Sequence, residues 1–152
     1  MDQTDISSII LALDHDKDIE ATREHLVDHG AQALPEMIDH FPKLKTWRAR
    51  NAIVYTAIKF ARRSENAKKL CSLGLQDKSK RVRQTACALA AFSLDRDFLP
   101  ELEAFAGRSD PETTEDAFAA INAIQKQNHH LFMDRQETGH VTWNVMGSSI
   151  EP

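Results

Sequence analysis

The chain is poor in glycine and proline, with five of each among 152 residues. A β-sandwich or β-barrel joins many short strands by turns and usually needs more of both residue types. Their scarcity therefore disfavours an all-β fold and favours helices. Hydrophobic residues make up 41% of the chain, which is too apolar for a disordered protein and sufficient for one folded domain.

Long hydrophobic runs are also missing, since no stretch approaches the ~18 apolar residues that span a bilayer. The amino terminus, Met1 to Asp5, is acidic, whereas a secretory signal begins with basic residues. The only cysteines, Cys71 and Cys87, fall inside helical apolar patterns. A disulfide between them is one alternative, but two free buried thiols in a reducing compartment are favoured. We expect a cytoplasmic protein with no membrane partner.

Each of three successive segments of the chain carries mostly one sign of charge and little of the other. Residues 43–83 hold thirteen Lys and Arg but two acidic residues. Residues 1–42 hold ten acidic residues and two basic ones, and residues 84–152 hold eleven and four. Either these segments neutralise one another within the fold, or a positive central surface lies between two negative ends and orients a charged partner. The sequence leaves both interpretations open.

What the chain does contain is an internal repeat. Long amphipathic helices are predicted at 46–62, 79–94 and 112–127. They align in one register, because Ala57, Ala90 and Ala123 coincide at a shift of 33 residues (57 to 90 to 123). A shorter helical pattern precedes each of them, at 32–41, 65–75 and 97–107. A helix pair that repeats at this period predicts a solenoid, because one pair cannot bury its apolar face alone.

The repeat region is expected to cover residues 1–127 in about four helix pairs. These are an atypical amino-terminal cap pair at 1–30 and three repeats, at about 32–62, 65–94 and 97–127. From residue 128 the helical period stops, and Leu131 to Met133 and Val141 to Val145 read as two short strands around a turn at Gly139. We therefore expect a C-terminal β-hairpin cap over 128–146 and a frayed tail at 147–152.

One segment resembles the signature of HEAT repeats, in which an Asp is followed six residues later by an Arg at the start of the second helix. Here it runs Asp77-Lys-Ser-Lys-Arg-Val-Arg83-Gln-Thr-Ala86. The resemblance extends over about residues 32–127 and implies an all-α fold, a short right-handed α-solenoid of HEAT-like helix pairs.

The HEAT-like register places Arg50 in the Arg position one period earlier and Asp110 in the Asp position one period later. Leu44 replaces the earlier Asp and Asp116 replaces the later Arg, so the pattern is incomplete at both ends. In HEAT proteins these side chains tie adjacent helix pairs together. The resemblance therefore assigns Arg50 and Arg83 to structure.

The second helices of HEAT-like pairs line a concave surface, and the resemblance implies one groove here. Polar stripes on helices 46–62 and 79–94 should face it, and arginine beside large aromatic residues is typical of interface hot spots. The candidate partner-binding residues are Arg48, Tyr55, Lys59, Arg62, Arg81, Gln84 and Phe92. A solvated helix face is the alternative. Trp143 is a secondary candidate, with a lid over the last helices as its alternative.

Motifs for catalysis are lacking. The sequence has no glycine-rich phosphate loop, nucleophile elbow or recognisable Cys–His arrangement. His25 and His29 lie at i and i+4, but no third metal ligand has an obvious spacing. We expect no enzymatic activity, metal or cofactor.

The leading hypothesis is therefore a non-catalytic protein-binding module. Short HEAT-like proteins of this size resemble bacterial immunity proteins (antitoxins), which bind and neutralise a cognate toxin, and also small scaffolds or adaptors. The alternative is a nucleic-acid-binding HEAT-like protein that uses the basic 43–83 segment, although its two acidic flanks would repel a long duplex.

Overall fold

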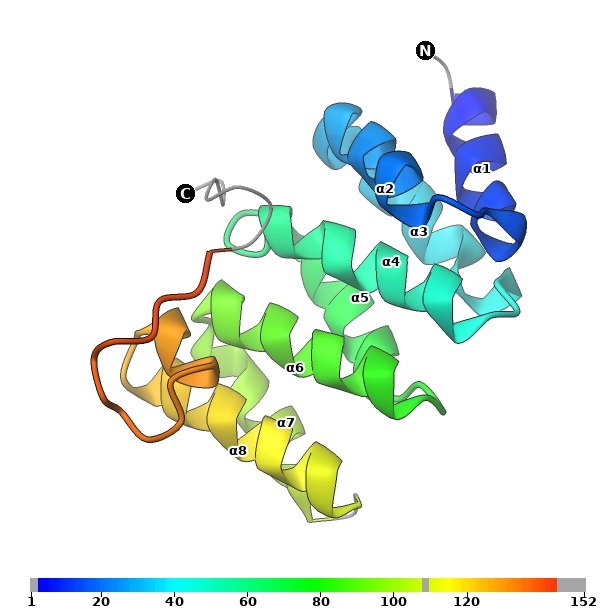
Figure 1. Cartoon of the computed structure of the whole chain (residues 1–152). Coiled ribbons are helices and arrows are strands. Elements are labelled where there is room, and N and C mark those ends of the chain that lie inside the picture. The colour runs from blue at the N-terminus through cyan, green and yellow to red at the C-terminus, as the bar shows by residue number, and fades with distance from the viewer. Residues whose placement is uncertain (1–2, 108–109, 145–152) are drawn as a thin grey trace.

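The computed structural model describes residues 3–107 and 110–144 (Figure 1). The α-helices in these residues are α1 (Gln3–Ala12), α2 (Ile19–Asp28), α3 (Leu34–His40), α4 (Trp47–Ala57), α5 (Glu65–Leu75), α6 (Lys80–Ser93), α7 (Leu99–Ala106) and α8 (Pro111–Gln125). Turns of 3-10 helix adjoin them: η1 (Leu13–His15), η2 (Gly30–Ala33), η3 (Phe41–Lys43), η4 (Ile58–Phe60), η5 (Arg96–Phe98) and η6 (His129–Phe132). No strand occurs among the described residues, so the all-α class is confirmed.

Side-chain caps fix where the helices begin. The hydroxyl of Thr46 accepts a hydrogen bond from the backbone N–H of Ala49, 3.2 Å away, and starts α4. The carboxylate of Asp110 does the same for Thr113 at 3.2 Å and starts α8. Each cap satisfies an N–H that has no partner inside its helix. The predicted helices therefore agree with the observed ones to within a few residues.

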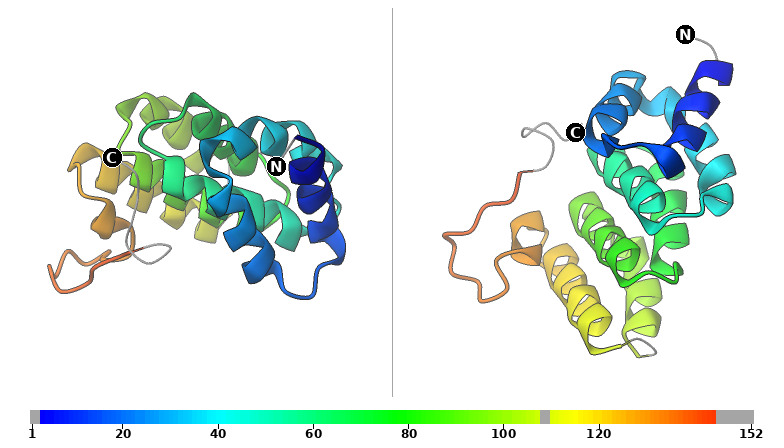
Figure 2. Two further views of the ribbon diagram at one scale, coloured as in Figure 1. Left: turned by 90° about the horizontal axis from the view of Figure 1, so that it is seen from above. Right: turned by 45° about the vertical axis from the view of Figure 1, so that its right-hand side comes forward.

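The helices lie in two layers (Figure 1, Figure 2). In one layer α2, α4, α6 and α8 contact one another in chain order, and in the other α1 contacts α3 and α3 contacts α5. Across the layers α5 packs on α6, and α7 packs on α8. Their apolar sides form one continuous core, whose largest fully buried side chains include Leu26, Met37, Ile53, Leu70 and Leu89. None of the described helices is long and apolar enough to cross a membrane.

Two arginine–aspartate pairs tie successive helix pairs together. Arg50 Nε lies 2.7 Å from Asp77 Oδ2, and Arg83 Nη2 lies 3.1 Å from Asp110 Oδ1. Each arginine also donates through Nη1 to the carbonyl oxygen six residues earlier, Leu44 O at 3.0 Å and Asp77 O at 2.8 Å. The pairs join the starts of α4 and α6 to the loops that precede α6 and α8. The structural assignment of Arg50 and Arg83 is confirmed.

Where Leu44 and Asp116 replace the expected Asp and Arg, other residues form the hydrogen bonds. Near Leu44, the carboxylate of Asp14 accepts hydrogen bonds from the backbone N–H groups of Lys45 and Thr46, each within 3.0 Å. At the other end Asp116 accepts from Arg135 Nη2 at 2.8 Å, so the charges of this pair are reversed. At both ends of the series of arginine–aspartate pairs, different residues therefore form the hydrogen bonds.

The predicted β-hairpin is wrong over the described residues 128–144. Leu131 and Phe132 are buried in η6, which contacts α6 and α8. The backbone that follows is held by side chains in place of a partner strand: the carboxylate of Asp134 accepts from the N–H groups of Thr138 and Gly139, at 2.9 and 2.8 Å. Val145, Met146 and the predicted frayed tail at 147–152 lie outside the described residues.

A close helix contact at Gly74 gives a first prediction. A Cβ atom at this position of α5 would lie 2.9 Å from Ala86 Cβ and 3.1 Å from Val54 Cγ2. We expect Gly74→Ala to lower the free energy of unfolding by about 1–3 kcal/mol, since overpacking outweighs the helix propensity that alanine gains. Urea unfolding followed by circular dichroism measures it. Gly107→Ala, one repeat later with its nearest contact at 3.7 Å, is the matched control. Equal stability of the two variants would contradict the contact.

A second prediction concerns the Arg50–Asp77 pair, whose side chains are 8% and 5% exposed. Arg50→Met leaves the Asp77 carboxylate buried without its cation, which typically costs about 3–5 kcal/mol of unfolding free energy. Thermal and urea unfolding both report this loss. Arg96→Met makes the same change at an exposed position and should be close to neutral. If both variants keep the parent stability, the pair does not hold the stack.

Candidate functional site

The amino-terminal halves of α2, α4 and α6 present an open face of the molecule. Between α2 and α4 it contains a hollow of about 460 Å³, whose lining includes Arg23, Trp47, Arg48, Asn51 and Tyr55. A hollow that combines two aromatic rings with several cations can bury apolar surface and fix anionic groups at the same time.

Trp47 lies at the centre of this face. It is the first residue of α4, directly after the Thr46 cap, and is half-buried. The guanidinium carbon of Arg48 lies 5.6 Å from the centroid of its ring, and that of Arg81 on α6 lies 5.1 Å from it. Two cations therefore share one indole, each within cation–π range.

A second aromatic–cation contact lies at the α2 side of the hollow. The guanidinium carbon of Arg23 lies 4.5 Å from the centroid of the half-buried Tyr55 ring. Arg23 Nη2 also lies 3.6 Å from Oε1 of the exposed Glu20 side chain, in an i,i+3 ion pair. The Tyr55 ring is therefore covered on one side by Arg23.

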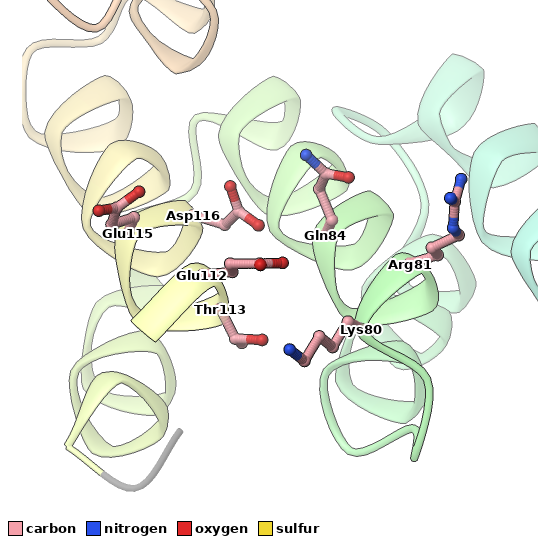
Figure 3. Close-up of a pocket in the computed structure, with 7 residues that line it drawn as sticks. All are labelled: Lys80, Arg81, Gln84, Glu112, Thr113, Glu115 and Asp116. Carbon is pink, nitrogen blue, oxygen red and sulfur yellow. The ribbon is translucent and has the colours of Figure 1, made fainter. Parts of the chain in front are cut away.

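The face continues into a second hollow between α6 and α8 (Figure 3). Lys80, Arg81 and Gln84 line its α6 side, and Glu112 and Glu115 line its α8 side. In Figure 3 the Lys80 side chain extends toward α8, whereas Arg81 points away from it. Cations therefore lie at the middle of the open face and carboxylates at its α8 edge.

The structure separates the predicted site residues into two groups. Arg48, Arg81 and Gln84 are exposed on the open face, and Tyr55 is half-buried there. Lys59 is half-buried in η4, directly after α4. The other group, Arg62, Phe92 and Trp143, lies near the carboxyl end of α6, where the chain after α8 returns.

The expectation that Phe92 is exposed is wrong, since its exposed fraction is 0%. The rings of His129 and Trp143 cover it, with centroids 4.4 and 4.3 Å away. Arg62 bonds internally as well: Nε donates to Phe92 O and Nη2 to His129 Nδ1, both at 2.9 Å. Trp143 is half-buried and also stacks on Phe132, so it forms part of a lid over this end.

Trp47 and Arg23 are the site residues that the sequence reasoning missed. Trp47 carried a usable signal, because a large aromatic residue directly after a helix cap lies on the first turn, next to Arg48. Arg23 is one of only two basic residues in the acidic segment 1–42. Its contact with Tyr55 depends on how α2 packs on α4, which no local pattern predicts.

Two kinds of nucleophilic group lie outside the open face, the cysteine thiols and the Ser7 hydroxyl. Burial raises the pKa of the Cys71 thiol well above its usual value and that of Cys87 to about 12, and both cysteines are free, as predicted. Ser7 Oγ donates to Glu36 Oε2 at 2.9 Å and lies 3.1 Å from His40 Nε2. The Ser7 hydroxyl therefore lies within hydrogen-bond distance of both a carboxylate and an imidazole nitrogen. Among the described residues, no three His, Cys, Asp or Glu are grouped so that they could hold a metal ion.

Comparisons with known proteins add no family to this geometry. No protein-family model, curated protein or solved structure matches the chain. The functional assignment therefore rests on the residues of the open face.

The lid over Phe92 gives a third prediction, on pH. Burial, followed by repulsion from His130 and Arg62, lowers the pKa of His129 from 6.5 to about 4. The unfolded chain therefore binds a proton between these values that the folded chain does not, and stability falls as the pH decreases from 6.5 to 4. We expect a smaller fall in melting temperature over this range for His129→Gln than for the parent. Parallel pH profiles would contradict a half-buried, neutral His129.

Proposed function

We propose that the chain is a non-catalytic protein-binding module that docks its partner on the open face of α2, α4 and α6. The observation that carries this proposal is the pair of aromatic–cation clusters there: Trp47 with Arg48 and Arg81, and Tyr55 with Arg23. Trp, Tyr and Arg dominate binding energy at protein interfaces, because they bury large areas and still form polar contacts. In this face they occur together in a hollow that solvent can enter.

The proposed architecture is a short α-solenoid of HEAT-like helix pairs. The recurrence of local features in one register supports it. Leu94 follows α6 and Gln127 lies just past α8, both with left-handed φ (55° and 53°), one repeat apart (94 to 127). Gln127 Nε2 also donates to Leu94 O at 2.9 Å, which links the two helix ends directly. Together with the arginine–aspartate pairs, this makes the contacts between successive helix pairs alike.

A protein partner is favoured over nucleic acid because several cations of the basic segment 43–83 are paired with carboxylates within the fold. Arg50, Lys68 and Arg83 form ion pairs with Asp77, Asp95 and Asp110. Pairing of this kind removes positive potential that a phosphate backbone would need. Carboxylates of α2 and α8 also flank the cations that remain on the open face.

The proposal of a non-catalytic role is supported by the raised pKa values of both thiols, which leave them poorly nucleophilic at neutral pH. Free, buried cysteines also fit the reducing cytoplasm that the sequence predicts. Within this class we propose an immunity protein that neutralises a cognate toxin, with a scaffold or adaptor as the other candidate. A charged face suits the fast, salt-sensitive association that such a complex needs.

A fourth prediction tests the binding role. Co-expressed with the product of the neighbouring gene, the chain should form a complex that is retained at low salt and weakened at high salt. Arg48→Glu and Arg81→Glu should each reduce the affinity by about tenfold, because each reversed charge meets the partner at the contact. Lys69→Glu, an exposed position on α5 in the other helix layer, is the control with the same charge change.

The outcomes of this experiment separate clearly. Loss of the complex in both arginine variants but not in the α5 variant supports docking on the open face. A complex that survives both charge reversals would place the interface elsewhere. Absence of any complex at low salt would count against an immunity role with that gene product.

A further inference from the structure

Several arginines in the described part of the chain form ion pairs with carboxylates. Arg50 and Arg83 bond to aspartates at the helix junctions, and Arg135 bonds to Asp116. Arg48 and Arg81 differ from these. Within residues 3–107 and 110–144 neither forms an ion pair with a carboxylate, and each is instead held against the Trp47 ring.

The positive charges of Arg48 and Arg81 are therefore not neutralised by a carboxylate within the described residues. Two guanidinium groups that contact one indole carry the same charge, so an anion reaching both of them is attracted twice. A guanidinium presents a planar set of N–H donors that matches the two oxygens of a carboxylate. The half-buried Trp47 ring excludes water on one side, which strengthens charge interactions beside it.

We propose that Trp47, Arg48 and Arg81 form the binding site for an acidic segment of the partner protein. A side-chain carboxylate of that segment is held by Arg48 and Arg81, and its aliphatic part lies against the Trp47 ring. This inference rests on the proposed function and names the chemistry that the docking face recognises.

The charges around the site favour an acidic peptide over a nucleic acid strand. Glu112 and Glu115 border the face on α8, and Asp16 and Glu20 border it beside α2. A strand that carries a phosphate at every nucleotide would meet these carboxylates on either side. A protein segment can place its own acidic residues over α4 and α6 alone, a width of about one helix spacing of 8–10 Å.

A titration with a model peptide tests this site. Trp143→Phe leaves Trp47 as the only tryptophan, because the chain has two. At low salt, the acetylated and amidated peptide Gly-Gly-Glu-Glu-Gly-Gly, whose charges are confined to its centre, should produce a saturable change in Trp47 fluorescence. Arg48→Gln and Arg81→Gln should each weaken this binding by about tenfold, the loss typical of one charge-assisted hydrogen bond. Calorimetry on the chain with Trp143 intact provides the same affinities without the reporter substitution.

Lys69→Gln removes one positive charge from the other helix layer and should leave the affinity unchanged. Hexalysine should not bind at Trp47. Failure of the Gly-Gly-Glu-Glu-Gly-Gly peptide to bind, or an affinity that neither arginine substitution changes, would overturn the acidic-segment site. Retention of a co-purifying partner in that case would leave the protein-binding role intact. Hexathymidylate binding that is lost in the same two variants would overturn both, because the site would then recognise a phosphate backbone.

Discussion

The stack depends on the need to neutralise two arginines away from water. Arg50 is 6% exposed, and a guanidinium buried to that extent is strongly destabilising unless carboxylates and carbonyls surround it. Asp77 supplies the charge and Leu44 O a further acceptor. Arg83 repeats this arrangement with Asp110. The starts of α4 and α6 are therefore fixed against the loops that precede α6 and α8. The amino-terminal ends of α4, α6 and α8 therefore lie side by side, and this alignment brings Trp47 within reach of Arg81.

The helical part of the fold could be predicted from sequence because its determinants are local. The apolar period and cap residues such as Asp110 act within a turn or two of each helix. The same local pattern then recurs at Ala57, Ala90 and Ala123. After α8 the determinants are not periodic. Asp134 binds the backbone N–H groups of Thr138 and Gly139, and the N–H of Trp143 donates to His130 Nδ1 at 2.7 Å. The alternating pattern there suggests strands. In the structure, however, side chains accept hydrogen bonds from backbone N–H groups that a sheet would need.

The candidate site was predictable only in part for a similar reason. A helical stripe identifies which residues leave the core of one helix, and Arg48, Arg81 and Gln84 follow it. It contains no information about a distant segment that returns over the same helix. Phe92 lies on such a stripe and is nevertheless fully buried, because the lid made by His129 and Trp143 covers it. Half of the expected groove is thus closed by the chain itself, and the half beside Trp47 remains open.

The charge blocks of the sequence become an ordered pattern on this open half. Helix pairs that stack in chain order place early, middle and late residues at successive positions in space. The arginines of the basic segment differ in their contacts: Arg50 and Arg83 pair with aspartates inside the stack, while Arg48 and Arg81 stay on its face. The acidic residues of α8 follow directly, so positive charge is confined to the middle of the face. If the proposed partner docks there, position along the chain sets the orientation in which its charges can be matched.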